Sequence, residues 1–478
     1  MAARATNTSF LQRLAQQLRS KMPRAKRLLA FPTRPAINEE LMLRVEELAR
    51  QRTTPLSLLD LYRFGNHPSP AQRLRNAQFL HFELPRRIAQ RVIELRDRLP
   101  PGLAEKRGIQ NVMGWYAGYV EELQAFPKPM DSEQEYDFTC LLASILCDHT
   151  SIPRALAHGI QEYRADMSYE DLLLDPDRES IEQTLTGFYT ARIGLRFLVE
   201  HHIVSNDARE GYSGIIASHC SPRQVATAAA ADAERLCRAA LGNAPTVRTI
   251  GTDKDDFCYV PSHLYYMIVE TLKNSCRAVV EKHDPIYRAA ALEVSPSTLL
   301  DQRIRLEARQ KAFARATPTE LPPVKVIVAM GEEDVTIKVA DEGGGVPRSD
   351  LRLLWTFFYT TFPPSFPSSP APLPGGRAGG GSLDENVTVT NPAGNVSAGP
   401  FTFPNVGTEP VLAGHGMGLP LSRIYARYFG GDLEVKSLEG FGMDSYLHLC
   451  KLGDKCEDIG LQVMRSPAGR DSTPTETS

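Results

Sequence analysis

A helix predicted over residues 263–278 presents four polar side chains whose types could do chemistry on a phosphorylated ligand. At 100° per residue they fall within one arc of about 100°. They are Glu270, Lys273, Asn274 and Arg277. A carboxamide oxygen is a hard ligand of the kind that Mg²⁺ binds, and lysine and arginine neutralise phosphate oxygens. The set suits a magnesium nucleotide; the alternative is a solvated helix face with a Glu/Lys pair.

Two glycine-rich segments follow further along the chain. In Asp341-Glu-Gly-Gly-Gly345, after a predicted strand, the glycines let another molecule approach the main chain closely, and the Asp341 carboxylate could accept a hydrogen bond from an exocyclic amine such as that of adenine. Gly414-His-Gly-Met-Gly-Leu419 runs into a predicted helix, whose first backbone amides can hold phosphate. The first segment alone is more often a tight turn, and a G-x-G-x-G segment alone is not specific, but the order of the two after the polar helix is.

The elements that position these residues change in type along the chain. Residues from Glu39 to about Ser205 show helical periodicity, and the second half mixes helices with strands. The spacing predicts one hairpin over 324–330 and 335–340 and a closing hairpin over 432–437 and 444–449. Between them, 363–410 contains ten prolines and eight glycines, a composition that cannot bury enough apolar area to fold, so we expect a disordered insertion at about 362–412.

The N-terminal residues carry a charge bias that predicts an organelle address. Eight lysines and arginines precede the first acidic residue, Glu39, and alternate with leucine, serine and glutamine. This is typical of a mitochondrial transit peptide, predicted over 1–38; a basic disordered arm is the alternative.

The composition limits the possible classes of protein. The 478 residues include 54 Lys+Arg and 57 Asp+Glu, and the net charge of -3 gives no reason to expect nucleic-acid binding. No stretch is apolar enough for a membrane span. The eight cysteines include no C-x-x-C pair, so we expect free thiols rather than a zinc site or a disulfide scaffold.

The ordered motifs resemble the N, G1 and G2 boxes of the GHKL ATPase superfamily, shared by gyrase B, the Hsp90 chaperones, histidine kinases and MutL. In detail the chain is similar to the mitochondrial α-ketoacid dehydrogenase kinases, through Glu83-Leu-Pro-Arg-Arg87, the Arg192 to Arg196 segment and Gly242-Asn-Ala-Pro245. The resemblance implies an α+β fold, in which an N-terminal all-α four-helix-bundle domain precedes a GHKL (Bergerat) α/β sandwich with a long disordered lid insertion. The implied domains are a helical regulatory and docking domain at 39–208, an ATP-binding kinase domain at 209–455 and a disordered tail at 456–478.

The same resemblance implies residue roles, with ATP and Mg²⁺ as cofactors. Glu270 matches the general base, Asn274 the Mg²⁺ ligand, and Lys273 and Arg277 phosphate-facing positions. Asp341 matches the adenine-binding aspartate. The remaining ATP-binding positions are Gly345, Gly414, His415, Gly416, Met417, Gly418 and Leu419.

Several residues depart from the family pattern or have more than one interpretation. Tyr266 stands where the pyruvate dehydrogenase kinases have a histidine that orients the base, and Met443 replaces a threonine near the adenine. His149, Arg192 and Arg196 match a regulatory pocket that suits a ketoacid carboxylate. The alternatives are a phosphoacceptor role or a core position for His149, and a solvated or carboxylate-paired face for the two arginines.

The implied protein is a serine kinase of the mitochondrial matrix that phosphorylates and inactivates the E1α subunit of a 2-oxoacid dehydrogenase complex. The branched-chain complex is favoured over the pyruvate complex. Implied partners are E1α, the lipoyl-bearing E2 core and a second copy in a homodimer. The alternatives are a histidine autokinase-like signalling protein and a catalytically weak ATP-binding interaction protein.

Overall fold

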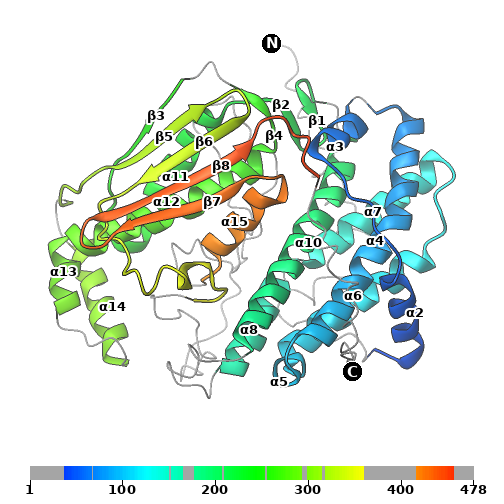
Figure 1. Cartoon of the computed structure of the whole chain (residues 1–478), viewed down its shortest axis with the longest axis horizontal. Coiled ribbons are helices and arrows are strands. Elements are labelled where there is room, and N and C mark those ends of the chain that lie inside the picture. The colour runs from blue at the N-terminus through cyan, green and yellow to red at the C-terminus, as the bar shows by residue number, and fades with distance from the viewer. Residues whose placement is uncertain are drawn as a thin grey trace, which may run out of the picture.

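The structure is a computed structural model that describes residues 37–66, 68–149, 152–164, 177–206, 209–252, 256–292, 299–314, 318–359 and 416–456. The chain is α+β, as predicted, with helices in its first half and helices with mixed strands in its second (Figure 1). Almost all of the predicted transit peptide, the predicted insertion, the predicted tail after residue 456, and Gly414 with His415 lie outside the described residues.

Long helices packed side by side form the first half, as the periodicity predicts. Helix α4 contacts α2, α6, α7 and α10, and α6 also contacts α8. The helices are α2 (Glu39–Ala49), α3 (Leu58–Gly65), α4 (Pro70–Arg98), α5 (Pro101–Ala104), α6 (Arg107–Ala125), α7 (Ser132–Asp148), α8 (Ile152–Arg164) and α10 (Arg178–Val204).

Helix α4 shows how the sequence specifies this half. Its N-terminus is set by the Ser69 side chain, which accepts a hydrogen bond from the Gln72 amide at 3.2 Å, and by Pro70 in the first turn, where no amide donor is needed. The apolar positions behind the predicted periodicity all lie in the core; they are Ala77, Leu80, Leu84, Ile88, Val92 and Leu95. Burial of this stripe against α6 and α10 holds the helices together.

The second half contains a five-stranded sheet of order β3-β5-β6-β8-β7 and a small sheet of order β1-β2-β4. In the larger sheet β3 runs parallel to β5 and the other pairs are antiparallel. The strands are β1 (Tyr212–Ser213), β2 (Ile216–Cys220), β3 (Val247–Ile250), β4 (Phe257–Tyr259), β5 (Val324–Met330), β6 (Asp334–Ala340), β7 (Asp432–Leu438) and β8 (Gly442–Cys450). Both predicted hairpins are confirmed as β5–β6 and β7–β8.

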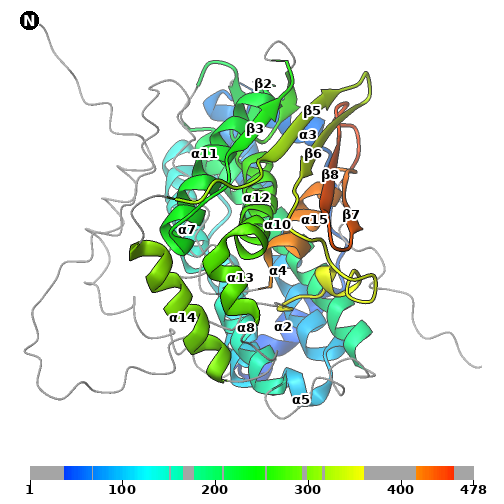
Figure 2. The ribbon, with the colours of Figure 1, turned by 90° about the vertical axis from the view of Figure 1, so that its left-hand side faces the viewer.

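Helices α11, α12 and α15 lie on one face of the larger sheet, while the opposite face is free of helices in the described part of the chain (Figure 2). The strands alternate buried and exposed residues accordingly, as in β5, where Val324, Val326 and Val328 point inward. The helices of this half are α11 (Pro222–Leu241), α12 (Pro261–His283), α13 (Pro285–Leu292), α14 (Leu299–Ala314) and α15 (Gly418–Tyr428), with a 3₁₀ turn η2 (Leu353–Trp355).

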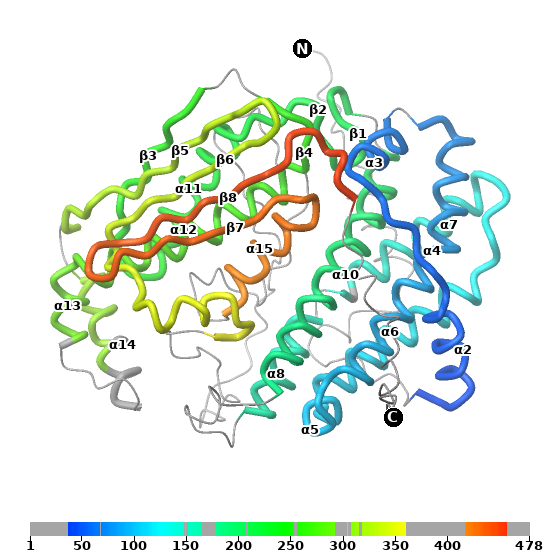
Figure 3. The backbone as a smooth tube through the Cα atoms, viewed as in Figure 1, coloured from blue at the N-terminus to red at the C-terminus, as the bar shows by residue number. Residues whose placement is uncertain are grey.

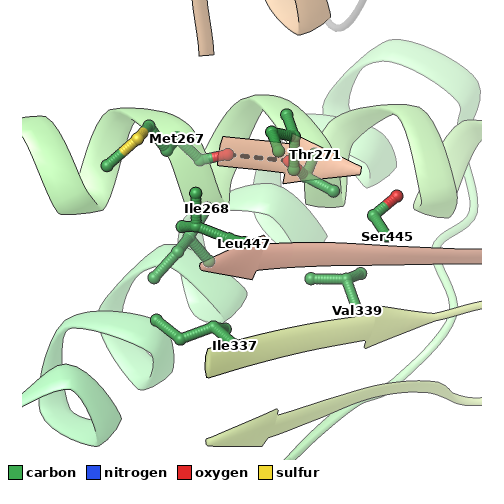
Figure 4. Close-up of a pocket in the computed structure, with 8 residues that line it drawn as sticks. Met267, Ile268, Thr271, Ile337, Val339, Ser445 and Leu447 are labelled. Carbon is green, nitrogen blue, oxygen red and sulfur yellow. Dashed lines mark hydrogen bonds between the residues drawn. The ribbon is translucent and has the colours of Figure 1, made fainter. Parts of the chain in front are cut away.

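Helix α12 packs its apolar side on the sheet. Met267, Ile268 and Thr271 face Val339 and Ser445 across a cavity of about 10 Å³ (Figure 4). Such a volume holds at most about one water molecule, so this cavity cannot take a nucleotide.

The chain returns to its first half after β8. In the tube view the last described segment leaves the sheet and reaches α3 (Figure 3). There the Leu59 amide donates to the Gly453 carbonyl oxygen at 3.1 Å, and Ser57 forms an isolated β-bridge with Cys456. Together with the packing of α10 on α15, this contact joins the two halves.

Close contact between α6 and α8 depends on Gly108. A Cβ atom there would collide with the Ala155 carbonyl oxygen and lie 2.7 Å from the Gly159 amide nitrogen, both in the backbone of α8. We expect Gly108→Ala to lower the free energy of unfolding by about 1–3 kcal/mol, because the helices must separate. Gly114→Ala, on the same helix with open space around it, should instead raise it by about 0.5–1 kcal/mol. Urea denaturation measures both; equal effects would contradict the packing described.

Candidate functional site

The polar face of α12 is arranged as the periodicity predicts. Glu270, Lys273, Asn274 and Arg277 are all half-buried. The Lys273 ammonium lies 2.7 Å from a Glu270 carboxylate oxygen, with side-chain exposures of 14% and 19%. The predicted Glu/Lys pair therefore exists, but it is too enclosed to be an ordinary solvated pair. No hydrogen bond to the Asn274 carboxamide comes from any other described residue.

The glycine-rich loop after β6 contacts α12 at Ser275 and Ala278. A buried hydrogen bond of 2.7 Å joins the Ser275 hydroxyl to Asp341 Oδ2, and Gly343 packs against Ala278. Asp341 follows the last residue of β6, as predicted. Burial raises the pKa of its carboxyl group, while the hydrogen bond from Ser275 lowers it.

Gly345 is a position in this loop at which glycine is required. Its φ of +67° is left-handed, and a Cβ atom would lie 2.7 Å from the Leu438 carbonyl oxygen. Lys282 of α12 also binds this loop. Its ammonium group donates hydrogen bonds to the carbonyl oxygens of Glu342 and Phe441 at 3.1 and 2.9 Å. The loop is thus held between α12 and the β7–β8 turn.

The second glycine-rich loop meets the same helix at Glu270. Helix α15 begins at Gly418, and a Cβ atom there would lie 2.6 Å from a Glu270 carboxylate oxygen. Met417 provides no side-chain cap, and within the described part of the chain no hydrogen bond uses the backbone amides of Gly418 and Leu419. Gly416, with φ +60°, sits against the backbone of Phe358 and Tyr359. One helix therefore contacts both glycine-rich loops, as the motif order predicts.

Tyr266 lies one turn before Glu270 and packs on Tyr425 of α15, with ring centroids 5.1 Å apart. Burial, followed by the charge of Glu270, raises the pKa of its hydroxyl well above the ordinary value. The phenol is therefore protonated at neutral pH and can act as a hydrogen-bond donor beside the carboxylate.

His149, Arg192 and Arg196 also lie together, in the core of the helical half. The His149 ring is 3% exposed and stacks on Tyr116 at 5.4 Å. Burial, then the charges of Arg192 and Arg196, lower its pKa well below the ordinary value, so the ring is neutral. Arg192 donates to the His149 carbonyl oxygen at 3.0 Å, whereas Arg196 pairs with Glu200 of its own helix. Such burial opposes a phosphoacceptor role for His149.

Comparison with known proteins decides the family. Residues 55–217 match the family model of mitochondrial branched-chain alpha-ketoacid dehydrogenase kinase. The mitochondrial pyruvate dehydrogenase (acetyl-transferring) kinase of Arabidopsis thaliana is 36% identical over 85% of this chain and 93% of its own length. The kinase of the same name from Schizosaccharomyces pombe is 31% identical over 88% and 99%. Isozyme 1 of Rattus norvegicus is 28% identical over 87% and 81%.

The chain belongs to the family of mitochondrial α-ketoacid dehydrogenase kinases. The predictions of a protein kinase and of a location in the mitochondrial matrix are thereby confirmed. No helix in the described part of the chain is both long and apolar enough to cross a membrane.

A clamp joins the helical half of this kinase to the irregular segment that follows the 3₁₀ turn η2, at residues 356–358. The peptide at Thr356 and Phe357 is bound on both sides by α8 and α10. The Phe357 amide donates to Glu182 at 3.0 Å, and its carbonyl oxygen accepts from Arg164 at 3.3 Å. Arg178 donates to the Thr356 hydroxyl at 3.2 Å.

The clamped segment and Tyr189 of α10 contact the second glycine-rich loop. The Phe357 ring stacks on Tyr189 of α10 at 5.2 Å, and the Tyr189 hydroxyl contacts the Met417 sulfur at 4.0 Å. The Phe358 amide donates to the Gly416 carbonyl oxygen at 2.9 Å. Phe358 has a φ of +61°, a strained conformation for a non-glycine residue, which the contacts on both sides maintain. The kinase thus couples its helical half to the loop through three consecutive peptides.

Sequence reasoning missed Ser275 and Glu182. A hydroxyl on the buried side of an amphipathic helix was the available signal for Ser275. Nothing local marks Glu182, because its partner Phe357 lies 175 positions further along the chain.

The pH dependence of stability tests the clamp. Burial raises the pKa of Glu182 to about 7 from an ordinary value of 4.5. The folded state therefore holds a proton that the unfolded state releases, so this group's stabilising contribution is full below about pH 4.5 and is lost as pH rises through about 7. In Glu182→Gln this loss is absent. The free energy of unfolding of the variant relative to wild type should rise by about 2–3 kcal/mol between pH 5 and 8 in denaturant titrations.

Glu179→Gln, an exposed position on the same helix, removes one charge without touching the clamp and should follow the wild type. If the free energies of unfolding of Glu182→Gln and wild type changed with pH in parallel, the assigned burial of Glu182 would be contradicted.

Proposed function

We propose that this protein is a Mg-ATP-dependent serine kinase that phosphorylates, and so inactivates, the E1α subunit of a 2-oxoacid dehydrogenase complex. The observation that carries the proposal is the position of α12. Its Glu270 lies against the start of α15, while its Ser275 hydrogen-bonds Asp341 of the other glycine-rich loop. These two contacts support a site in which the carboxylate, the carboxamide and the two cations of this helix face lie between a loop suited to a base and a loop suited to phosphates.

Each residue of the polar face has a role in this proposal. Glu270 is the general base that accepts the proton of the substrate serine hydroxyl. Lys273 and Arg277 neutralise phosphate oxygens, and the contact between Lys273 and Glu270 keeps the base close to that charge. Tyr266 orients the base in place of the histidine of the pyruvate dehydrogenase kinases.

In this proposal the two loops bind different parts of the nucleotide. Asp341 accepts from the adenine amine, and Gly345 lets the base pack on the main chain. Gly416, Met417, Gly418 and Leu419 present the uncapped amides of α15 to the phosphates, where the helix dipole also favours negative charge. Gly414 and His415 extend this loop in the proposal.

The residues present fit a magnesium ion that arrives with the nucleotide. Mg²⁺ keeps several waters and commonly takes one or two protein oxygens together with phosphates. Asn274 offers a carboxamide oxygen without a partner among the described residues. The described residues contain no cluster of three or more His, Cys, Asp or Glu that could hold a metal by itself. A bound Mg²⁺ would neutralise charge on the phosphates.

We further propose a GHKL (Bergerat) sandwich at 209–455, with a lid insertion at about 362–412, after a four-helix-bundle docking domain at 39–208. The mixed sheet with helices on one face supports the sandwich. We assign 1–38 to a transit peptide. The predicted tail at 456–478 begins with Cys456, which is bridged to Ser57, and the rest of it lies outside the described residues. The uncovered sheet face is the surface proposed for a homodimer, and His149, Arg192 and Arg196 are proposed to serve a regulatory ketoacid.

Two 2-oxoacid dehydrogenase complexes are candidate substrates. The sequence favours the branched-chain complex, and the family model bears that name. The relatives that match along most of their length are named for pyruvate dehydrogenase. We therefore propose the pyruvate complex as the first substrate to test, with docking on its lipoyl-bearing E2 core.

Replacing the proposed base separates catalysis from nucleotide binding. Glu270→Gln should lower the rate of serine phosphorylation on E1α by about 10²–10⁴-fold while Mg-ATP still binds. Radiolabel transfer and calorimetry measure the two quantities. Glu133→Gln, an exposed position on α7, is the control and should keep the wild-type rate. A fully active Glu270→Gln protein would contradict the assignment, and nucleotide binding without transfer by the wild type would favour the weakly catalytic interaction protein.

Side-by-side assays determine the substrate. We expect the initial rate with pyruvate dehydrogenase E1 to exceed that with branched-chain E1 by about tenfold or more, since one lost or mismatched substrate contact changes a rate by roughly this factor. Equal amounts of each E1, with its own E2 core added, are compared in the same reaction. A faster rate with branched-chain E1 would reverse the preference.

A further inference from the structure

The carboxylate of Asp341 is held by three hydrogen bonds from three different segments. Ser275 of α12 donates its hydroxyl to Oδ2 at 2.7 Å. The amide of Gly343 donates to Oδ1 at 2.9 Å, and the amide of Met443 donates to the same oxygen at 3.3 Å. Ser275 is 1% exposed and Asp341 6% exposed, so water does not compete for these bonds.

These bonds determine which part of the carboxylate remains available. Each carboxylate oxygen has two lone-pair directions. Oδ1 uses both for backbone amides, whereas Oδ2 uses one for the Ser275 hydroxyl. Among the described residues, no donor occupies the second lone-pair direction of Oδ2, so it can accept one more hydrogen bond. The Ser275 bond fixes the rotation of the carboxylate and so aims that direction.

We propose that Ser275 is a positioning residue that aims Asp341 at the 6-amino group of a purine and thereby makes the site select 6-amino over 6-oxo purine nucleotides. This inference rests on the proposed function, in which Asp341 receives the adenine. An ionised carboxylate is only an acceptor, so it pairs with an amine donor and repels a carbonyl oxygen. The hydroxyl itself touches Asp341 and acts through it.

The charge of Asp341 links this selection to pH. Burial raises the pKa of Asp341, the Ser275 hydroxyl lowers it, and Asp444 of β8 raises it. Asp444 is itself paired with Lys338 at 2.7 Å, and the buried thiol of Cys276 also faces the carboxyl group from α12. Without Ser275 the carboxyl group would protonate at a higher pH. A protonated carboxyl group donates, and it would then accept a 6-oxo purine.

The test measures dissociation constants of Mg-ATP and Mg-GTP for the full chain between pH 5.5 and 8.5. We expect Ser275→Ala to weaken Mg-ATP by about three- to tenfold at pH 8, the usual effect of one buried hydrogen bond, and to change Mg-GTP by less than about twofold. The pH at which the preference for ATP disappears should move upward. Ser275→Cys keeps the volume with a weaker donor and should fall between Ser275→Ala and wild type.

A matched control separates this effect from a loss of stability. Ser213 of β1 is also buried and donates one hydrogen bond, to the Tyr62 carbonyl oxygen at 2.6 Å, away from the glycine-rich loops. Ser213→Ala should lower the thermal stability while the ATP preference and its pH dependence stay as in wild type. If it moved the pH dependence as Ser275→Ala does, the effect would be structural and the positioning role would be overturned.

Asp341→Asn distinguishes failure of this inference from failure of the proposed site. An amide can donate to a 6-oxo group, so this variant should lose the preference for ATP at every pH. A retained preference would overturn the proposed adenine site and the inference with it. Loss of preference in Asp341→Asn, together with wild-type behaviour of Ser275→Ala across the pH range, would overturn the positioning role alone.

Discussion

The candidate site depends on how α12 packs against the five-stranded sheet, that is, on the rotation of the helix about its axis and on its position along that axis. The apolar side of the helix is buried on β6 and β8, and this burial fixes the direction of its polar side. A shift of one residue would turn Glu270 and Asn274 by 100° and remove them from both loops. The contacts of Glu270 with Gly418 and of Ser275 with Asp341 lie about a turn and a half apart on the helix, so they set its register at two points.

The helical half also positions the second glycine-rich loop, through the segment at Phe357. Its helices α8 and α10 hold the peptide at Phe357 by both its amide and its carbonyl group, and that peptide adjoins Gly416 and Met417. A change in the packing of α10 would therefore reach the proposed phosphate loop without an intermediate flexible link. Because His149 and Arg192 lie on or against the same helix, the proposed regulatory cluster and the loop share one rigid element.

Patterns within one element could be predicted from the sequence, and contacts between distant elements could not. The period of 3.6 residues identified the core stripe of α4 and the polar face of α12. Runs of β-branched residues identified the β5–β6 hairpin, and the β7–β8 hairpin was predicted from its place after the second glycine-rich motif. Strands β3 and β4 were missed, because each is only three or four residues long and β3 pairs with a strand far along the chain. The clamp on Phe357 and the bond from Ser275 were missed for the same reason, since both join residues more than 60 positions apart.

We propose that one face of α12 and two glycine-rich loops form a single magnesium-nucleotide site. Calorimetric titration of the full chain with ATP, with and without Mg²⁺, tests it most directly, using wild type and Asn274→Ala. The account predicts one nucleotide per chain, with binding strengthened by Mg²⁺ in wild type and indifferent to Mg²⁺ in the variant. Undiminished Mg²⁺ dependence in Asn274→Ala, or no uptake of ATP by folded wild type, would contradict it.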